Sequence, residues 1–520
     1  MTGMTLKKVL CVLILAAAYS GLVRAQEPKS KIIGMYVHQH WPYNHPYAAR
    51  TWTIEDWRGY AGGLKKIGYN SVMIWPMTET MPDPLLPSDR ASLAKHGRVI
   101  DMLHGELGMR VFIALCPNVV PIDEQARLAA FEKRHFFYSD QRINPADKAA
   151  VAKMIRQREE IFKFLAKADG VAIIDSDPGG YAGSTHRQFV DLLLEHRKMF
   201  DRLRPGIELI YWMHAGWAAY SRWYATGKFA WGSDEEFLET LRMLKEANPE
   251  PWGVAGGARH PFEKAGLNDR MISFNYGRIE GEPSFPMTNF GGDAAYQGGK
   301  AMLGRGVMGN AQTHCVQLPN TFAFARGAVG GTLTEADYEA FADRLIVGQG
   351  RMIVGAWKTL AGDESGAMRA EASKIEGLVS KPLRAGDLQG LFFGSPSRFL
   401  TDLAMMLRTK AGYADFVRAV ERNDKVAAAL EDFLTATERW QKTHGYENQW
   451  RFPKLNETLR KLNLQAINRV LDYNDVGCVR FEKNPGATPF ERIRTGYRNV
   501  ETYTPQLIAA MRQTLEALQK

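Results

Sequence analysis

The first 330 residues repeat a unit in which an amphipathic helix, a glycine and an apolar strand follow one another. Residues 54–66 place apolar side chains at helical spacing, Gly68 follows, and residues 69–75 are rich in apolar and aromatic side chains. The same order returns over residues 94–115. A glycine after the last helical turn ends a helix, and alternating helices and strands are typical of a parallel sheet. The repeat therefore predicts an α/β fold.

Eight strands can be placed in this part of the chain, at residues 32–38, 71–75, 110–115, 171–175, 208–212, 252–255, 271–275 and 307–311. Helices fit between nearly all of them, with room only for a short one at residues 260–267. Eight strands over this length predict a (β/α)8 barrel from residue 30 to residue 330. The alternative is an open doubly wound sheet, but no Gly-x-Gly-x-x-Gly follows the first strand.

The pattern changes after about residue 331, where helical periodicity dominates. We predict helices at residues 335–346, 366–379, 397–407, 413–421, 425–443, 452–474 and 504–518. Two short runs, 388–393 and 476–481, read as strands instead. Residues 331–520 are therefore expected to form an α-helical C-terminal domain.

The N-terminus resembles a secretory signal. Lys7 and Lys8 precede a short apolar run, and residues 23–25 suit cleavage after Ala25. The run is too short to span a bilayer. We therefore predict a signal peptide at residues 1–25 and a secreted or periplasmic protein with no membrane span.

Charge and cysteine content exclude several classes of function. Loss of Lys7, Lys8 and Arg24 lowers the formal net charge from +9 to +6, and no basic block indicates nucleic-acid binding. Cys116, Cys315 and Cys478 would remain, too few for a disulfide framework. There is no Cys-x-x-Cys or His-x-x-x-His spacing. We therefore expect no cofactor and no bound metal, whereas the oligomeric state stays open.

Two aspartates lie where the fourth strand ends. Asp175 and Asp177 follow Val-Ala-Ile-Ile and precede Pro178-Gly-Gly. Side chains two apart on a strand point to one face, so a strand that continued to Asp177 would place both carboxylates roughly 7 Å apart along the backbone. In a parallel barrel the catalytic groups gather at this end of the strands. Asp175 and Asp177 are therefore the predicted catalytic residues.

Polar and aromatic residues follow the other strands at the same end. The candidates for binding a substrate are His38, His40, Trp75, Glu79, Asn118, Tyr211, Trp212, His214, Asn275, Tyr276, Asn310, Gln312 and His314. The aromatic ones, together with Trp41, suit stacking on sugar rings, and the amides and histidines suit hydroxyl groups. Glu79 and Glu280 are reserve acids. The amino-terminal ends of the strands are preceded by plain turns. The polar and aromatic residues therefore gather at the carboxyl ends alone, which indicates that the site lies there.

Cleavage of a glycosidic bond explains this set of residues. One carboxylic acid must keep a proton for the leaving oxygen, and a second group must meet the positive charge at the anomeric carbon. Two close carboxylates push their pKa values apart, which gives one acid and one ion. Other interpretations stay open: Asp175 and Asp177 could be turn formers or metal ligands, and His38 and His40 could bind a metal with Asp175.

The acids after the fourth strand, together with the stretch from Val307 to Asn320, resemble the organisation of retaining β-hexosaminidase-type glycoside hydrolases. The layout is similar to O-GlcNAcase-like and α-N-acetylglucosaminidase-like enzymes and, more loosely, to α-glucuronidases. The resemblance implies that the first acid holds a substrate acetamide and the second protonates the leaving group. Those families have adjacent acids, whereas Ser176 separates Asp175 from Asp177 here. Inverting and direct-nucleophile mechanisms, and a sugar without an acetamide, therefore stay open.

We predict an exported glycoside hydrolase that acts on a poly- or oligosaccharide. Asp177 is expected to be the general acid because it lies nearer the strand end, and Asp175 its ionised partner. Two alternatives belong to other classes: a polysaccharide lyase or metal-dependent hydrolase, and a non-catalytic glycan-binding protein.

Overall fold

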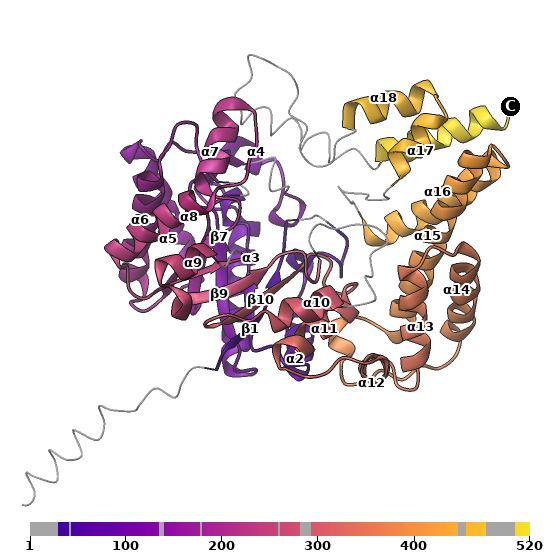
Figure 1. Ribbon diagram of the computed structural model, residues 1–520, viewed down its shortest axis with the longest axis horizontal. Helices are drawn as coiled ribbons and strands as arrows, with labels where there is room; N and C mark the ends of the chain where they lie inside the picture. The colour runs from indigo at the N-terminus through magenta and orange to yellow at the C-terminus, as the bar shows by residue number, and fades with distance from the viewer. Residues whose placement is uncertain are drawn as a thin grey trace, which may run out of the picture. The chain divides into compact units, whose positions relative to one another are not determined.

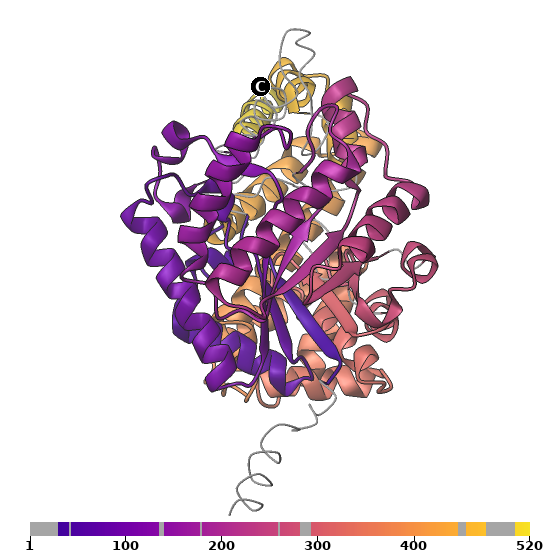
Figure 2. The same cartoon turned by 90° about the vertical axis from the view of Figure 1, so that its left-hand side faces the viewer.

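Eight buried apolar runs form the strands of a closed parallel barrel. The computed structural model describes residues 30–40, 43–134, 140–176, 179–257, 260–280, 293–445, 454–474 and 505–520. Within them the barrel strands are β1 (Ile32–Val37), β2 (Ser71–Ile74), β3 (Arg110–Leu115), β6 (Gly170–Ile174), β7 (Glu208–Met213), β8 (Trp252–Gly256), β9 (Met271–Asn275) and β10 (Gly306–Ala311). All eight predicted strands are confirmed to within one residue at each end, and in Figure 2 they lie inside a layer of helices.

The barrel closes between its first and last strands. Residues of β1 pair in parallel with β10 from Ile32↔Gly306 to Val37↔Ala311, and the other edge of β1 pairs with β2. All neighbouring barrel strands are parallel, so their carboxyl ends open on one face. The fold is therefore the predicted (β/α)8 barrel, and this shared face is where the candidate residues must meet.

Helices cover the outside of the barrel, and side-chain caps set where several of them begin. Thr53, Thr185 and Ser233 each accept a hydrogen bond from the third residue of the helix that follows, and that residue's side chain binds back to the cap. The longer helices are α2 (Ile54–Lys66), α3 (Pro87–Gly105), α5 (Lys148–Phe162), α6 (His186–Leu203), α7 (Trp217–Thr226), α8 (Asp234–Ala247), α10 (Asp293–Lys300) and α11 (Leu318–Ala328). The short elements are α4 (Asp123–Ala126), α9 (His260–Ala265), η1 (Ala49–Thr51), η2 (Thr78–Thr80), η3 (Phe131–Lys133), η5 (Asn268–Arg270), and the antiparallel pair β4 (Val119–Pro121) and β5 (Asp140–Arg142).

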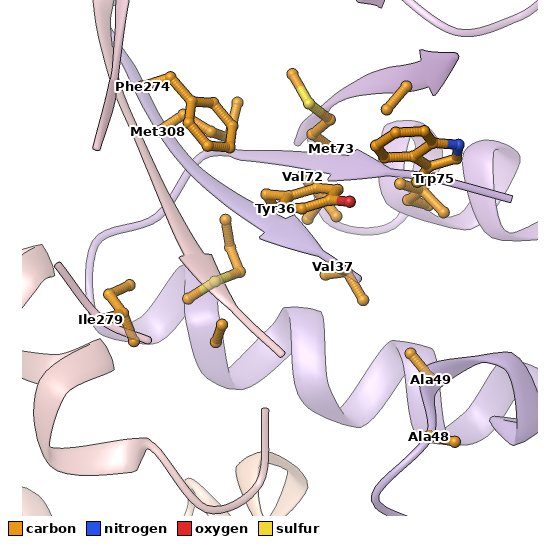
Figure 3. Close-up of a cluster of buried hydrophobic side chains, with 14 of the residues drawn as sticks. Tyr36, Val37, Ala48, Ala49, Val72, Met73, Trp75, Phe274, Ile279 and Met308 are labelled. Atoms are coloured by element: carbon orange, nitrogen blue, oxygen red, sulfur yellow. The ribbon is translucent and has the colours of Figure 1, made fainter. Parts of the chain in front are cut away.

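Aromatic rings from separate strands pack together inside the barrel (Figure 3). Tyr36 of β1 lies 6.4 Å from Trp75, 5.4 Å from Trp212 and 5.9 Å from Phe274, measured between ring centroids. All four residues are buried. These rings lie at or near the carboxyl ends of their strands, so they form a buried aromatic layer directly below the carboxyl face of the barrel.

The chain beyond residue 331 is helical, as predicted (Figure 1). Its helices are α12 (Glu335–Leu345), α13 (Gly350–Ala361), α14 (Ser365–Val379), α15 (Pro396–Arg422), α16 (Val426–His444), α17 (Leu455–Lys461) and α18 (Gln465–Asn474), and residues 505–518 form a further helix. From Ile32 onward the chain is one compact unit. In the part of the chain that the structure describes, no helix combines the length and the apolar character needed to cross a bilayer.

Three local predictions in this region were wrong. Residues 388–393 contain a 3-10 turn, η6 (Gln389–Leu391), because Gly390 lies against the backbone of Gly59 in α2 and leaves no room for a side chain there. The two helices predicted at 397–421 are the single helix α15, in which Gly412 allows close contact with Phe433 of α16. The helix predicted at 452–474 is divided near Asn463, whose φ is +47°. The run at 476–481 lies outside the described residues.

Candidate active site

Strand β6 ends at Ile174, one residue earlier than predicted. Asp175 therefore begins the turn after the strand, and the alternation of side chains along a strand does not apply to it. Asp177 and Trp41 lie outside the described residues. The predicted pairing of Asp175 with Asp177 thus stays a prediction.

The carboxylate of Asp175 is fully buried and accepts four hydrogen bonds. Its Oδ1 accepts from Ser176 Oγ at 2.9 Å and from the backbone N–H groups of His214 and Gly216, each at 3.1 Å. Its Oδ2 accepts from the hydroxyl of Tyr211 at 2.9 Å. Burial raises the pKa of the Asp175 carboxyl, and the charge of His214 and these hydrogen bonds oppose that shift. Asp175 therefore joins the end of β6 to the loop that follows β7.

Glu79 and Glu280 make the same kind of connection. Glu79 follows β2 and accepts a hydrogen bond from the backbone N–H of Cys116, just after β3, at 2.6 Å. Glu280 follows β9 and accepts hydrogen bonds from the N–H groups of Gln312 and Thr313, just after β10, each at 2.7 Å. We call Glu79, Asp175 and Glu280 the carboxylate clamps. Each binds the residues that follow the next strand in the barrel order, so three of the four acids predicted from the sequence hold the loops of this face in place.

Glu280 gives this arrangement a testable pH dependence. Burial raises the pKa of its carboxyl, against the hydrogen bonds from Thr313 and Gln312. The folded protein therefore binds the Glu280 proton more tightly than the unfolded chain does, so the free energy of unfolding falls as pH rises above about 4.3, by up to about 1.4 kcal/mol per unit of pKa difference. Glu280→Gln removes this contribution. We expect the wild type to lose urea resistance relative to Glu280→Gln between pH 4.5 and pH 7.5; a gap that stays constant or moves the other way would contradict the assignment.

The aromatic candidates differ in exposure. Trp75, Tyr211 and Trp212 are buried, with Trp75 and Trp212 brought to 6.1 Å between ring centroids. Trp75 Nε1 also donates to Glu79 at 3.2 Å. Tyr276 is instead 40% exposed, and its ring centroid lies 5.6 Å from that of His214. Among the predicted stacking residues that the structure describes, Tyr276 is thus the exposed one.

Three of the predicted histidines gather near the end of β1. His40 Nδ1 lies 2.5 Å from His38 Nε2, and His314 Nε2 lies 3.4 Å from the carbonyl oxygen of His38. Burial lowers the pKa of His314 to about 3 and, with the nearby His314 and Arg50, lowers that of His38. The rings of His38 and His314 are therefore neutral near pH 7. Among the residues described, no three or more histidine, cysteine or carboxylate side chains are placed to hold a metal ion.

The predicted amide side chains mostly bind backbone. Asn118 Nδ2 donates to the carbonyl oxygens of Ile143 and Gly180, each at 2.9 Å. Asn310 Nδ2 donates to Glu280 O at 3.0 Å, and Asn275 Nδ2 donates to Gly298 O at 2.7 Å. Gln312 is buried beside them. Asn118 and Asn310 thus hold loop backbones and Asn275 holds the backbone of α10, which is a supporting role that residue type alone does not distinguish from substrate binding.

Two buried arginines were missed by the sequence analysis. Arg50 donates to the carbonyl oxygens of Gln39 at 2.8 Å and Arg134 at 2.6 Å, and also to that of His40. Arg158 of α5 donates to Pro117 O at 2.9 Å and Val119 O at 2.8 Å. Burial lowers their pKa values to about 9 and about 10. Each fixes a loop after a barrel strand, and no local motif marks an arginine that reaches distant carbonyl groups.

Comparison with known proteins yields structural similarity alone. No family model and no curated protein matches the chain. A GH138 enzyme targeting pectin rhamnogalacturonan II is similar over 86% of this chain and 68% of its own, with 12% identity and a TM-score of 0.47. The O-GlcNAc hydrolase of Thermobaculum terrenum is similar over 95% of this chain and 96% of its own, with 11% identity and a TM-score of 0.38. A structure of the pneumococcal virulence factor StrH is similar over 74% of this chain and 98% of its own, with 10% identity and a TM-score of 0.35.

An O-GlcNAc hydrolase, a kind of enzyme that the sequence is predicted to resemble, is thus among the similar structures. At these identities the similarity concerns the fold. What the chain does is argued below from its own side chains.

Proposed function

We propose that this protein is a glycoside hydrolase that cleaves O-glycosidic bonds of an oligo- or polysaccharide at the carboxyl face of its barrel. The observation that carries the proposal is the placement of Tyr276. Its exposed ring packs beside His214, whose backbone N–H binds the carboxylate of Asp175. A partly exposed aromatic ring next to the turn that contains Asp177 offers an apolar surface for a sugar and an acid for the bond beside it.

In this proposal Asp177 is the general acid that protonates the leaving oxygen. It is two residues beyond Asp175, whose four hydrogen bonds fix the start of the turn. Asp175 itself is fully buried, so its proposed part is to position the turn rather than to touch the sugar. The sequence predicts Asp175 to be the ionised partner of the acid, whereas the burial of its carboxylate favours the positioning role.

A non-catalytic glycan-binding protein is the second candidate, and one observation favours it. The carboxylate clamps are the acids that the structure describes just beyond β2, β6 and β9. All three are buried and hydrogen-bonded. The proposed hydrolysis therefore rests on Asp177 as its acid. Release of reducing ends by the wild type but not by Asp177→Asn supports the hydrolase, whereas sugar binding without products supports the second candidate.

We further propose that the protein is exported. The support is the sequence of residues 1–25, which lie outside the described residues: two lysines, a short apolar run and a small-residue site ending at Ala25. Export would place the site where extracellular or periplasmic glycans are met.

A further inference from the structure

The loop between α7 and α8 folds back onto the residues that follow β7. Gly227 ends α7 with a φ of +71°, and Gly232 N–H donates to the carbonyl oxygen of Ala215 at 2.8 Å. A Cβ on Gly216 would lie 3.3 Å from the Cα of Gly232, so the two backbone segments are in close contact. The loop is therefore held beside His214, which precedes Ala215.

This return brings two exposed aromatic rings to the rim of the barrel. Phe229 is 42% exposed and packs edge-on against Tyr220 and Trp223 of α7, with both pairs of centroids 5.8 Å apart. Trp231 packs against Phe229 at 5.5 Å and is still 63% exposed. A tryptophan side chain is usually buried because burial of its apolar area is favourable. An exposed tryptophan that other rings hold in place, as Trp231 is, therefore indicates a ligand-binding surface.

Trp231 and Tyr276 flank one histidine. The ring of Trp231 lies 5.7 Å from that of His214 at 85°, and the ring of Tyr276 lies 5.6 Å from it at 61°. The strand between their loops, β8, ends at Gly256 and is followed by Gly257, so neither residue puts a side chain between the two loops. The result is one aromatic surface, formed after β7 and β9, that continues outward from the residues bound to Asp175.

We propose that Trp231 and Tyr276 form a binding surface for a sugar residue beyond the bond that is cleaved, so that the preferred substrate is a glycan chain rather than a single sugar on a small leaving group. This inference rests on the proposed function, which it extends to the length of the substrate. The occupant is a sugar ring because the surface is aromatic and partly exposed to solvent, and because it adjoins the turn that begins at Asp175. A protein partner would need a larger apolar area than two rings provide.

The test uses full-length protein in native gels that each contain pectin, xylan, laminarin or glycol chitosan. The variants are Trp231→Ala, Tyr276→Ala and the control Val329→Ala, which removes a 51% exposed apolar side chain next to Gly68, at the opposite end of the barrel. We expect at least one polysaccharide to retard the wild type and Val329→Ala. The apparent affinity of that polysaccharide for Trp231→Ala should be about tenfold lower than for the wild type, which is equivalent to about 1.4 kcal/mol. Loss of turnover in Trp231→Ala should be larger on that polysaccharide than on 4-nitrophenyl monosaccharides.

Three results would overturn the inference: no retardation of the wild type by any of the four, equal retardation of Trp231→Ala with an unchanged melting curve, or a change in sedimentation that shows the rings to be a contact between protein copies. Retardation that depends on Trp231 without cleavage of any glycan would support the surface and contradict the hydrolase, so the two proposals fail separately.

Discussion

Asp177→Asn is expected to lower glycoside hydrolysis by about 10²–10⁴-fold, the range that a positioned general acid contributes. Asparagine keeps the size of the side chain but has no proton to give to the leaving oxygen. The loss should appear in kcat on a substrate with a poor leaving group, and less on an aryl glycoside whose leaving group needs little protonation. Initial rates on both substrates measure this difference.

The matched control is Asp101→Asn, an exposed aspartate of α3 paired with Lys167 on the outside of the barrel. It should retain wild-type rates. Both variants should melt as the wild type does. If Asp177→Asn kept full activity on both substrates, the proton would come from another group and the assignment of Asp177 would fail.

Asp175→Ala is expected to destabilise the fold by about 3–5 kcal/mol. The alanine leaves the N–H groups of His214 and Gly216 and the hydroxyl of Tyr211 without their buried acceptor. Each such group costs about 1–3 kcal/mol, and removal of a buried carboxylate returns part of that sum. The urea midpoint of unfolding, compared with that of the wild type, measures the change.

Asp175→Asn separates hydrogen bonding from charge. Oδ1, which accepts both backbone N–H groups, is kept, and the Tyr211 hydroxyl can turn to accept from the new amide. We expect a loss of no more than about 1 kcal/mol. Equal destabilisation by alanine and asparagine would show that the carboxylate charge, not its connection to the loop after β7, is what the fold requires.

The barrel could be predicted because its evidence is local. Runs such as 110–115 and 271–275 are apolar, bounded by turns and alternate with amphipathic helices, and the structure places β3 and β9 at those residues. The predicted break between residues 407 and 413 was wrong because a glycine inside a helical pattern indicates either a break or close packing, and Gly412 packs against Phe433. The domain boundary at 331 rests on the same local change of pattern and stays a prediction.

The site could be predicted as a place but not as a set of roles. The candidates His38, Glu79, Asp175 and His214 do follow barrel strands at the carboxyl face. Which of them is buried depends on neighbours far along the chain: Glu79 on Cys116, and Asp175 on the loop after β7. Trp231 was not predicted as a binding residue because it follows a helix rather than a strand. The Phe-Ala-Trp run between two helices is a sequence pattern from which it could have been predicted.

The account depends most directly on hydrolysis itself. The most direct measurement is proton NMR of wild-type protein incubated with plant, algal and bacterial glycans and aryl glycosides, each with and without a chelator. We predict a new free hemiacetal at the cleaved bond, with its first anomer showing retention or inversion. A product with a ring double bond and ultraviolet absorbance, cleavage abolished by the chelator, or intact glycans throughout would contradict the account.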